Sequence, residues 1–583
     1  MRHTLAHLLA QAVKEKYPEV KLTLGPAIDN GFYYDIDFGD TKIHDTELPE
    51  IEKMMKKNLK DWNEFTHKEV SSDEALKYFK GNEYKTELIN EISDKGEVIT
   101  LYTCGKDEGF TDLCRGGHSE NPNKEIPVDS FILDRIAGAY WRGDEKNKML
   151  TRIYGLAFNT KQELDEYLAQ REEARARDHK KLGRELDLFT FSDLIGPGLP
   201  LWTPRGTLVR NLLDGFVWEL RQKAGYEQVD IPHITKKDLY EKSGHWDKFK
   251  DDLFRINTRE GHEFAMKPMN CPHHTQIYDR KPWSYRELPQ RYASTTKVYR
   301  DEQSGELAGL SRVRSITQDD AHVFCQMADV KNEMDKIYEI IKTFYNSFGF
   351  TLIPRLSLHD PKKMDSYLGT PETWEKTEGE LRNLIKEKGD DKISIEALGE
   401  AAFYGPKIDF VAKDAIGRDW QVATIQLDMS MPESFDLSCT NEKGEKERIV
   451  MIHAAIMGSI ERFMSILIEH TAGVFPVWLS PVQVSIIPVR ENHDNGAKEI
   501  LEKLQSNFIR AEIISGNESL GKRIHQVKKF NTPYVIVLGD KEIESGMLTI
   551  ETRNIGQDGK GEKLQMSLPD FLTHINSEIK NRS

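Results

Sequence analysis

The chain has 583 residues, of which 38% are hydrophobic and 30% are charged, and its formal net charge is −15 at pH 7. This length exceeds what one hydrophobic core supports and indicates three or four domains, while no apolar run approaches the ~18 residues of a membrane-spanning helix. Five cysteines are too few, and odd in number, for a disulfide framework, so a reducing compartment is expected, and the negative charge argues only weakly against a nucleic-acid partner.

Residues 1–160 alternate short helical and strand patterns and predict an N-terminal α+β domain. His3 and His7 are four positions apart and would share one helix face, and Cys114 and His118 lie in the run LCRGGH. HxxxH together with CxxxH has the composition of a zinc site, so a structural metal is one interpretation that the residues leave open.

Residues 161–186 are rich in Glu, Arg and Lys with few apolar positions, which predicts a helical linker between domains. Positive charge gathers at 171–184 and again at 521–529. The simpler interpretation of both stretches is a solvated helix face.

The segment 187–475 is expected to form the largest domain. Residues 206–225 predict an amphipathic helix that ends at Gly225, and 417–430 alternate like a strand. Residues 382–390 are helical in pattern, and 450–473 predict one long buried helix with small residues in its middle. From residue 476 the pattern becomes strand–helix–strand, which predicts a small α/β domain with a mostly parallel sheet over 476–583.

Three possible metal ligands lie in this large segment: Cys271 in MKPMNCPHH, His322 in QDDAHVFC and His453 in MIHAAIMGS. A Cys with two His is a known catalytic zinc set that leaves positions open for a substrate. The three residues lie far apart in the sequence, so their spacing alone does not establish a metal site. Each residue on its own could simply be packed in a core.

Arginines accompany these ligands. Arg300 and Arg312 lie in a Gly- and Ser-containing loop between two strand-like runs. Arg462 lies in an apolar segment, where a buried charge costs several kcal/mol unless it is paired or used. Because a guanidinium binds phosphate and carboxylate through paired hydrogen bonds, these residues suit either group.

These runs carry a resemblance. GPGLPLWTPRG resembles motif 1 of the class II aminoacyl-tRNA synthetases, VYRDEQSG with RVRSITQDDAHVFC resembles motif 2, and GSIERF resembles motif 3. MKPMNCP, QDDAHVFC and AFYGPKID are similar to the threonyl-tRNA synthetase branch. The resemblance implies a multidomain α+β protein: an editing domain at 1–160, a helical linker at 161–186, an antiparallel-sheet class II catalytic core at 187–475 and an α/β anticodon-binding domain at 476–583. It also implies a cytoplasmic homodimer paired through motif 1, with no membrane attachment.

The implied reaction needs no general base for activation, because the carboxylate of threonine is itself the nucleophile toward the α-phosphate of ATP. Catalysis is then positioning and charge neutralisation. By resemblance the catalytic residues are Arg300, Arg462 and His245, and Mg²⁺ bridges the phosphates. The ATP-binding residues are Arg300, Glu302, Arg312, Ile316, Gln421, Thr424 and Arg462. Ile316 stands where the family usually has an aromatic residue, so less stacking on adenine is expected.

Zinc held by Cys271, His322 and His453 would select threonine, because valine lacks the hydroxyl and an apolar pocket separates such isosteres only roughly a hundredfold. The threonine-binding residues implied are Met269, Gln318, Asp320, Tyr404, Lys407, Gln421 and Gln426. Serine lacks only a methyl group, worth about 1–3 kcal/mol, so hydrolytic editing of Ser-tRNA is expected. The resemblance assigns editing to His3, His7, Cys114 and His118, acting on a water without metal.

Three further expectations concern tRNA. His245 in SGHWDKF resembles a histidine that helps to deprotonate the terminal ribose hydroxyl, although packing beside Trp246 is an equal alternative. For the anticodon we expect base contacts from Asn517 and Glu542 and phosphate contacts from Lys522 and Arg523.

The chain starts at the first editing helix, whereas bacterial relatives usually begin with a ubiquitin-like module. A natural absence and a truncated sequence both remain open. A non-catalytic paralogue, or a class II enzyme for another amino acid, is disfavoured because no ligand or arginine of the pattern is missing.

Overall fold

A computed structural model of the chain describes residues 1–105, 109–390, 393–516, 518–553 and 561–582. The chain separates into two compact units, Met1–Glu172 and Glu173–Ser583. Among the described residues, no helix combines the length and apolar character needed to cross a membrane.

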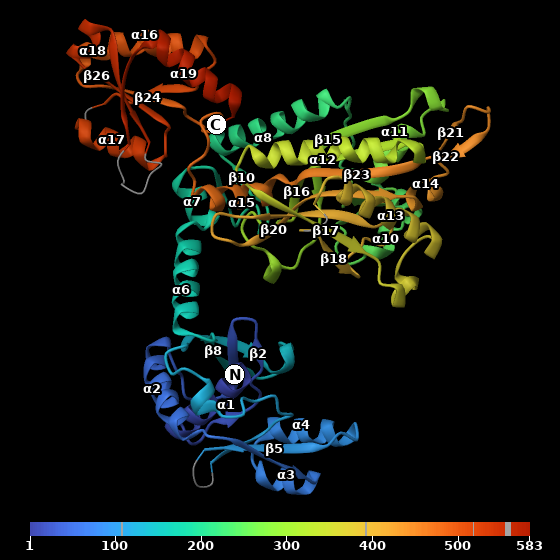
Figure 1. Ribbon diagram of the computed structural model, residues 1–583, viewed down its shortest axis with the longest axis vertical. Coiled ribbons are helices and arrows are strands. Elements are labelled where there is room, and N and C mark those ends of the chain that lie inside the picture. Colours follow the sequence, from blue (N-terminus) through green and yellow to red (C-terminus); the bar gives the residue numbers. More distant parts are fainter. Residues whose placement is uncertain (106–108, 391–392, 517, 554–560, 583) are drawn as a thin grey trace. The chain divides into compact units, whose positions relative to one another are not determined.

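The first unit contains two antiparallel sheets with helices packed on them (Figure 1). Helix α1 (Arg2–Lys16) buries Leu5, Leu8 and Leu9 against the larger sheet and against α2 (Leu48–Asn58). The larger sheet has the order β1 (Lys21–Leu22), β3 (Gly31–Asp37), β8 (Met149–Ala157), β7 (Phe131–Tyr140), with β2 (Ala27–Ile28) paired to β3. The smaller sheet is β4 (Phe65–Val70), β5 (Ile99–Cys104), β6 (Phe110–Leu113), accompanied by α3 (Ser72–Tyr78), α4 (Glu83–Asp94) and α5 (Pro122–Glu125).

The predicted linker is helical but broken. Helix α6 (Lys161–Ala176) is followed by α7 (His179–Glu185), which starts after Asp178 because the Asp178 side chain accepts a hydrogen bond from the Lys180 amide as an N-cap. The boundary between the two units falls within α6.

The second unit is organised by a long, mainly antiparallel sheet. Its order is β11 (Glu227–Gln228), β15 (Gln290–Tyr299), β16 (Ser315–Cys325), β23 (Val450–Ser459), β20 (Asp419–Asp428), β19 (Lys407–Lys413), β17 (Thr351–Leu358), β18 (Ile395–Leu398). The pairs β11–β15 and β17–β18 are parallel and the other neighbours are antiparallel. This confirms the antiparallel-sheet core expected from the resemblance.

Helices cover this sheet. The predicted amphipathic helix is α8 (Pro204–Lys223), which is capped by Thr203 and lies beside α12 (Val330–Asn346) over one face (Figure 1). The pattern at 382–390 belongs to α13 (Pro371–Glu387). A short pairing of β9 (Phe189–Thr190) with β10 (Leu201–Trp202) precedes α8.

The prediction of one long helix at 450–473 is wrong. Residues Val450–Ser459 form β23, and only Ile460–Thr471 form a helix, α15. β23 is a central strand buried on both faces, so its apolar run has no alternation that distinguishes it from a buried helix. The change of structure falls where Gly458 takes a positive φ of 70° and the Ser459 side chain caps α15.

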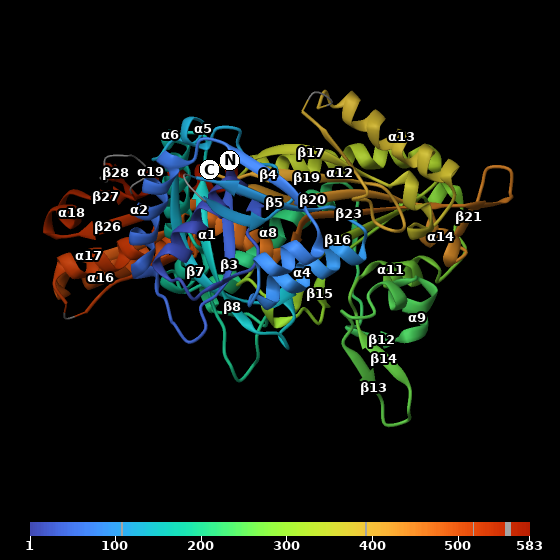
Figure 2. The ribbon, with the colours of Figure 1, turned by 90° about the horizontal axis from the view of Figure 1, so that it is seen from below.

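The second unit also contains a smaller antiparallel sheet of three strands. Its order is β12 (Ile234–Lys236), β14 (Glu263–Met266), β13 (Arg255–Asn257), and with α9 (Lys237–Lys242) it projects from the long sheet in Figure 2. Helices α10 (His245–Lys248), α11 (Cys271–Tyr278) and α14 (Ser430–Ser434) and the hairpin β21 (Ser438–Thr440)–β22 (Lys446–Arg448) complete this part.

The C-terminal sheet is mixed, which corrects the expectation of a mostly parallel sheet. Its order is β25 (Ala511–Ile513), β24 (Val484–Pro488), β26 (Tyr534–Leu538), β27 (Met547–Thr552), β28 (Lys563–Ser567). The first three strands are parallel, and β27 and β28 add antiparallel pairs because they follow short connections rather than helical crossovers of full length. The helices are α16 (Asp494–Ser506), α17 (Leu520–Lys529), α18 (Asp540–Ser545) and α19 (Leu568–Asn581).

Candidate functional sites

The three predicted metal ligands meet at the centre of the long sheet. His322 on β16 lies directly opposite His453 on β23, and Cys271 begins α11. The potential ligand atoms of the three residues lie within 4.8 Å of one another, and all three side chains are buried. His322 Nε2 is 3.1 Å from His453 Nδ1, so the ring nitrogens face a common point.

A second layer of residues fixes these rings. His322 Nδ1 lies 2.7 Å from Nδ1 of His274, and His453 Nε2 lies 2.9 Å from Oδ2 of Asp428. Such partners orient the ligating nitrogen of a metal-bound histidine. Burial lowers the pKa of His322 well below its ordinary value, so the ring is neutral and one of its nitrogens carries the lone pair that a metal needs.

Polar side chains around this cluster are buried but incompletely bonded. Gln318 Oε1 and Asp320 Oδ2 have no hydrogen-bond partner among the described residues, nor has Nε of Arg300. Asp320 lies on β16 two positions before His322, on the same face of the strand. A buried polar atom without a partner is costly, so this arrangement is typical of a site that a polar ligand completes.

The other predicted threonine residues border the same region. Gln426 pairs in register with Lys407 on one side and with His453 on the other. The Tyr404 ring centroid is 5.3 Å from that of His453, and Arg300 Nη2 lies 3.2 Å from Sδ of Met269.

The predicted ATP residues form two groups. Glu302 and Arg312 are paired on the loop between β15 and β16, with Oε2 2.7 Å from Nη2, and Ile316 follows on β16. Arg462, in the first turn of α15, places its guanidinium 5.9 Å from the ring of Trp420.

Gln421 and Thr424 lie on β20 and share a polar network. The Gln421 side-chain oxygen accepts from Arg355, whose guanidinium lies 3.5 Å from Asp409. Asp409 also accepts from Thr424 and pairs with Lys407 at 2.6 Å. Gln421 is itself exposed, so it reaches this group only through Arg355.

His245 is fully buried beside the cluster. Its Nε2 is 3.9 Å from Cys271 Sγ, its Nδ1 is 2.9 Å from the Ser243 hydroxyl, and its ring stacks on Phe249. Burial lowers the pKa of His245 to about 4, so the imidazole is uncharged at neutral pH. Both the catalytic and the packing interpretation stay predictions.

The four predicted editing residues also meet. His3 and His7 share one face of α1, with their Nε2 atoms 3.1 Å apart, and Cys114 Sγ lies 3.2 Å from His118 Nε2 and 3.6 Å from His3 Nε2. His118 stacks on Phe65 with ring centroids 4.0 Å apart. His3, His7 and Cys114 line a cavity of about 340 Å³.

Three buried polar residues at this cavity, of which Asp112 and Lys85 line it, were not predicted from the sequence. Asp112 Oδ2 lies 3.3 Å from His7 Nδ1 and accepts from the Tyr34 hydroxyl at 2.5 Å, and its Oδ1 lies 2.5 Å from Lys85 Nζ. They come from β6, β3 and α4, so no local spacing connects them. The sequence offers one signal for them: two residues of opposite charge, Lys85 in EYKTELI and Asp112 in FTDLC, each with apolar residues nearby.

These contacts set the charge of the site. Burial would lower the pKa of His7, but the hydrogen bonds and charge interactions with Asp112 and Cys114 together outweigh it and raise that pKa to about 9. Burial would raise the pKa of Cys114, but hydrogen bonds from His118, His3 and His7 lower it to about 4. At neutral pH the cavity therefore presents a thiolate beside an imidazolium.

The anticodon predictions fare differently. Asn517 lies outside the described residues. Lys522 is exposed on α17. Arg523 is buried and donates to the backbone carbonyls of Pro488 and Ile514, but it also lines a cavity, so its phosphate contact stays a prediction. Glu542 caps α18 by accepting from the Gly539 amide and also accepts from the Thr549 hydroxyl, so a base contact would compete with these bonds.

The long antiparallel sheet, the buried arginines and the adjoining α/β domain define a class II aminoacyl-tRNA synthetase. Residues 254–471 match the family described as tRNA synthetase class II core domain (G, H, P, S and T), and residues 483–578 match the anticodon binding domain family.

The relatives specify the branch. The threonine–tRNA ligase of Flavobacterium johnsoniae is 47% identical over 581 residues, which cover 99% of this chain and 88% of that protein. The threonine–tRNA ligase of Porphyromonas gingivalis is 46% identical over 583 residues, which cover 99% of this chain and 87% of that protein. A crystal structure titled as the RNA binding domain of threonyl-tRNA synthetase from Cryptosporidium parvum is 33% identical with a TM-score of 0.65, and covers 69% of this chain and 98% of that one. The chain belongs to the threonine–tRNA ligase family.

Proposed function

We propose that this ligase selects threonine at the Cys271–His322–His453 cluster and removes misattached serine at the His3–His7–Cys114–His118 cluster. The observation that carries the proposal is the converging Cys/His/His set beside buried polar atoms of Gln318, Asp320 and Arg300 that lack partners among the described residues. The separate catalytic, editing and anticodon-binding regions, with the boundaries expected from the sequence, are part of the same proposal.

The donor set fits zinc. One thiol and two imidazole nitrogens face a common point, and the outer contacts from His274 and Asp428 hold the rings in place. When bound, zinc supplies a Lewis-acidic centre with open positions that an amino group and a hydroxyl can fill together. Asp320 lies beside this point, and its Oδ2, which has no partner among the described residues, would accept a hydrogen bond from the amine or hydroxyl of threonine.

The arginines supply the activation chemistry. Arg300 lies next to Met269 at the threonine site, and burial lowers its pKa. Its Nε has no hydrogen-bond partner among the described residues, so a carboxylate or phosphate would stabilise this cation. Arg462 has the same character, with its pKa lowered by burial. In this proposal Arg300 neutralises the reacting carboxylate and α-phosphate, Arg312 contacts ATP, and Arg462 lies against adenine or reaches the γ-phosphate. Mg²⁺ bound with ATP would supply further positive charge to the phosphates.

The nucleoside would lie between these arginines. Glu302 offers a carboxylate to the adenine edge, and Ile316 offers an aliphatic face to the ring. Gln421 and Thr424 lie on β20, and the proposal assigns both to the nucleotide. For the later transfer step we assign His245 to the terminal ribose of tRNA, where an uncharged imidazole is in the form that accepts a proton.

The editing proposal rests on the charged cavity of the first unit. Cys114 and His118 lie in hydrogen-bond contact, and His7 is held by Asp112. In the metal-free form of the proposal, these groups orient a water toward a serine ester. The alternative of a structural metal uses the same four side chains.

The partners proposed are ATP, L-threonine and tRNA(Thr), with the anticodon read by the C-terminal domain. The homodimer and the cytoplasmic location expected from the resemblance stay predictions.

The experiment separates the two sites. The double variant His3→Ala/His7→Ala is expected to charge tRNA with threonine at the parental rate and to accumulate Ser-tRNA when serine is supplied. A matched control is His44→Ala with His67→Ala, which removes two histidines of the same unit that do not line the cavity. Clearance of preformed Ser-tRNA by the double variant at the parental rate would refute the editing assignment.

A further inference from the structure

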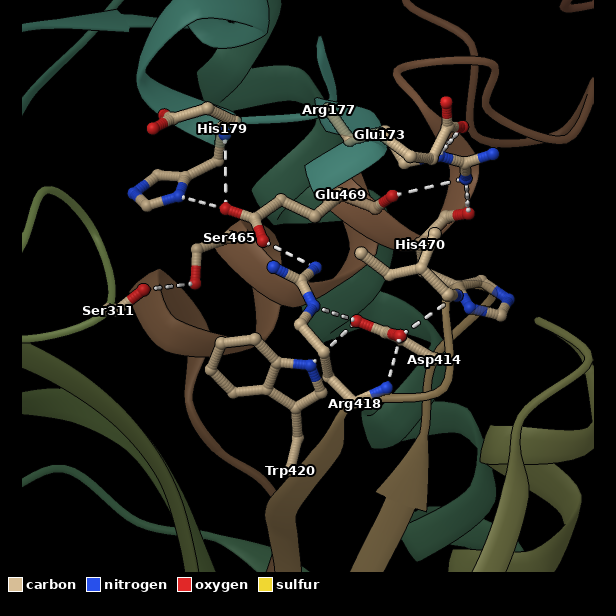
Figure 3. A network of polar contacts seen from close by, with 12 residues as sticks. Glu173, Arg177, His179, Ser311, Asp414, Arg418, Trp420, Ser465, Glu469 and His470 are labelled. Atoms are coloured by element: carbon tan, nitrogen blue, oxygen red, sulfur yellow. Dashed lines mark hydrogen bonds and ion pairs between the residues drawn. The ribbon is translucent and has the colours of Figure 1, made fainter. Parts of the chain in front are cut away.

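A buried histidine outside both clusters joins two parts of the ATP site. His179 begins α7, and its Nδ1 lies 2.6 Å from Oε1 of Glu469 near the end of α15 (Figure 3). On its other side the backbone N–H of Leu310, in the loop between β15 and β16, donates to His179 Nε2 at 3.1 Å. One imidazole thus connects this loop with α15.

The hydrogen bonds fix which nitrogen carries the proton. Because Nε2 of His179 accepts from an amide, the ring proton lies on Nδ1 and is donated to Glu469. Burial would raise the pKa of Glu469, but the hydrogen bonds from His179 lower it, so the carboxylate is charged. Its second oxygen lies 2.7 Å from Nη2 of Arg418.

The backbone of the loop between β15 and β16 packs directly against the His179 ring. Gly309 has a φ of 55°, and a Cβ atom there would lie 2.4 Å from His179 Nε2. Ala308 and Arg312 pair across the turn, and the Ser311 hydroxyl lies 3.0 Å from the Ser465 hydroxyl on α15 (Figure 3). The turn is therefore attached to α15 at two points, through Ser311 and through His179.

The same network extends to Arg462, another arginine of the proposed ATP site. Arg418 binds Asp414 at 2.7 Å, and the indole of Trp420 donates to the same carboxylate oxygen at 2.9 Å (Figure 3). The guanidinium of Arg462 lies 5.9 Å from the Trp420 ring. Glu469 thus stands between the turn that carries Arg312 and the ring that supports Arg462.

We propose that His179 is a positioning residue for ATP: it fixes the turn Ala308–Arg312 against α15 so that Arg312 is presented to the phosphates in one geometry. The inference rests on the proposed ATP role of Arg312. The Arg312 side chain is 48% exposed, so without a fixed backbone it would lose more conformational freedom when it binds a phosphate.

Two substitutions test the two hydrogen bonds of the imidazole separately. His179→Asn keeps a donor at the position of Nδ1 but has no acceptor for Leu310, whereas His179→Gln can place its carbonyl oxygen near the position of Nε2. Arg177→Ala is the control, because Arg177 donates to the backbone carbonyl of His470 and joins the same segment to α15 without contacting the turn.

The readouts are threonine-dependent ATP–pyrophosphate exchange and amide hydrogen exchange at Leu310. His179→Asn is expected to raise the KM for ATP about tenfold, the effect of losing one hydrogen bond, with an unchanged KM for threonine and faster exchange at Leu310. His179→Gln and Arg177→Ala are expected to stay within about threefold of the parental KM for ATP.

Equal KM increases for ATP and threonine, an unchanged KM for ATP in His179→Asn, or identical behaviour of Asn and Gln would each overturn the inference. A parental protein without threonine-dependent exchange would instead refute the proposed function. A His179→Asn protein that fails to fold, while His179→Gln folds and shows parental exchange at Leu310, would assign His179 a structural role and overturn the inference as well.

Discussion

Nδ1 of His7 lies 3.3 Å from Oδ2 of Asp112, and both buried side chains line the cavity that His3 and Cys114 also line. The carboxylate is also bound by Lys85 and Tyr34, so it is fixed on three sides. It therefore determines both the orientation and the charge of the His7 ring that faces Cys114.

Replacing Asp112 with Asn should impair editing without affecting activation. The amide is uncharged, so His7 loses the partner that holds its proton, and we expect hydrolysis of Ser-tRNA to slow by about 10–100-fold, the usual effect of removing a residue that orients a catalytic group. Deacylation of preformed Ser-tRNA measures the loss, with threonine-dependent pyrophosphate exchange as the reference. Asp35→Asn is the matched control, because Asp35 pairs with Arg152 on the opposite face of β3. Parental hydrolysis in Asp112→Asn would contradict the role of this pair.

The pH dependence of stability should report the His7 pKa. That pKa is raised in the folded chain from 6.5 to about 9, so the contribution of His7 to stability is fully present below pH 6.5 and is lost as the pH rises through about 9. Urea unfolding of the parental protein and of His7→Gln, followed at a spectroscopic probe in the first unit, should differ most at pH 6 and converge toward pH 9.5. A difference that is the same at both pH values would show that His7 does not carry the charge assigned to it.

Zinc binding should depend on Cys271 and not on other buried thiols. Cys271→Ser is expected to lose bound zinc and to lower threonine activation by at least ~100-fold, because outer contacts alone are worth about 10–100-fold in metal affinity. Cys325→Ser is the control, since Cys325 is also fully buried but lies in the apolar core. Elemental analysis of both variants decides, and an active parental preparation without zinc would exclude the metal assignment.

A buried ion pair between strand β16 and helix α8 should dominate local stability. Asp319 lies 3.5 Å from Arg221 of α8 and accepts from the backbone amides of Ile456 and Met457 beside the bulge between β16 and β23. Asp319→Ala leaves Arg221 buried and unpaired, so the free energy of unfolding should fall by about 3–5 kcal/mol, measured with urea. Asp319→Asn keeps an acceptor and should cost less. A loss below about 1 kcal/mol in the Ala variant would show that Arg221 finds another partner.

The motifs were predictable where local spacing carries the chemistry. His3 and His7 share a helix face because a helix repeats every 3.6 residues. The two strand-like runs around the Gly-containing loop are strands β15 and β16, but their antiparallel pairing was expected only through the resemblance. The meeting of Cys271, His322 and His453 could be expected only through the family resemblance, because strand order, not sequence distance, brings them together.

Other features could not be read from one sequence. The central strand β23 is apolar on both faces, so its pattern equals that of a buried helix. Asp112 and Lys85 come from two different elements and meet only when these pack together. Arg523 lies in a basic stretch of sequence, but in the fold its guanidinium donates to the carbonyls of Pro488 and Ile514. His179 likewise acquires its role from contacts with Leu310 and Glu469, which lie 131 and 290 positions away.

The most direct test of the account is ATP–pyrophosphate exchange with threonine, serine and valine, measured on one preparation whose zinc content is known. Threonine should support rapid exchange, serine should support slower exchange because it lacks only a methyl group, and valine should stay at background because it has no hydroxyl. Exchange with valine at the rate seen with threonine, or no exchange with any of the three, would contradict the assignment of Cys271, His322 and His453 as the threonine-selecting site.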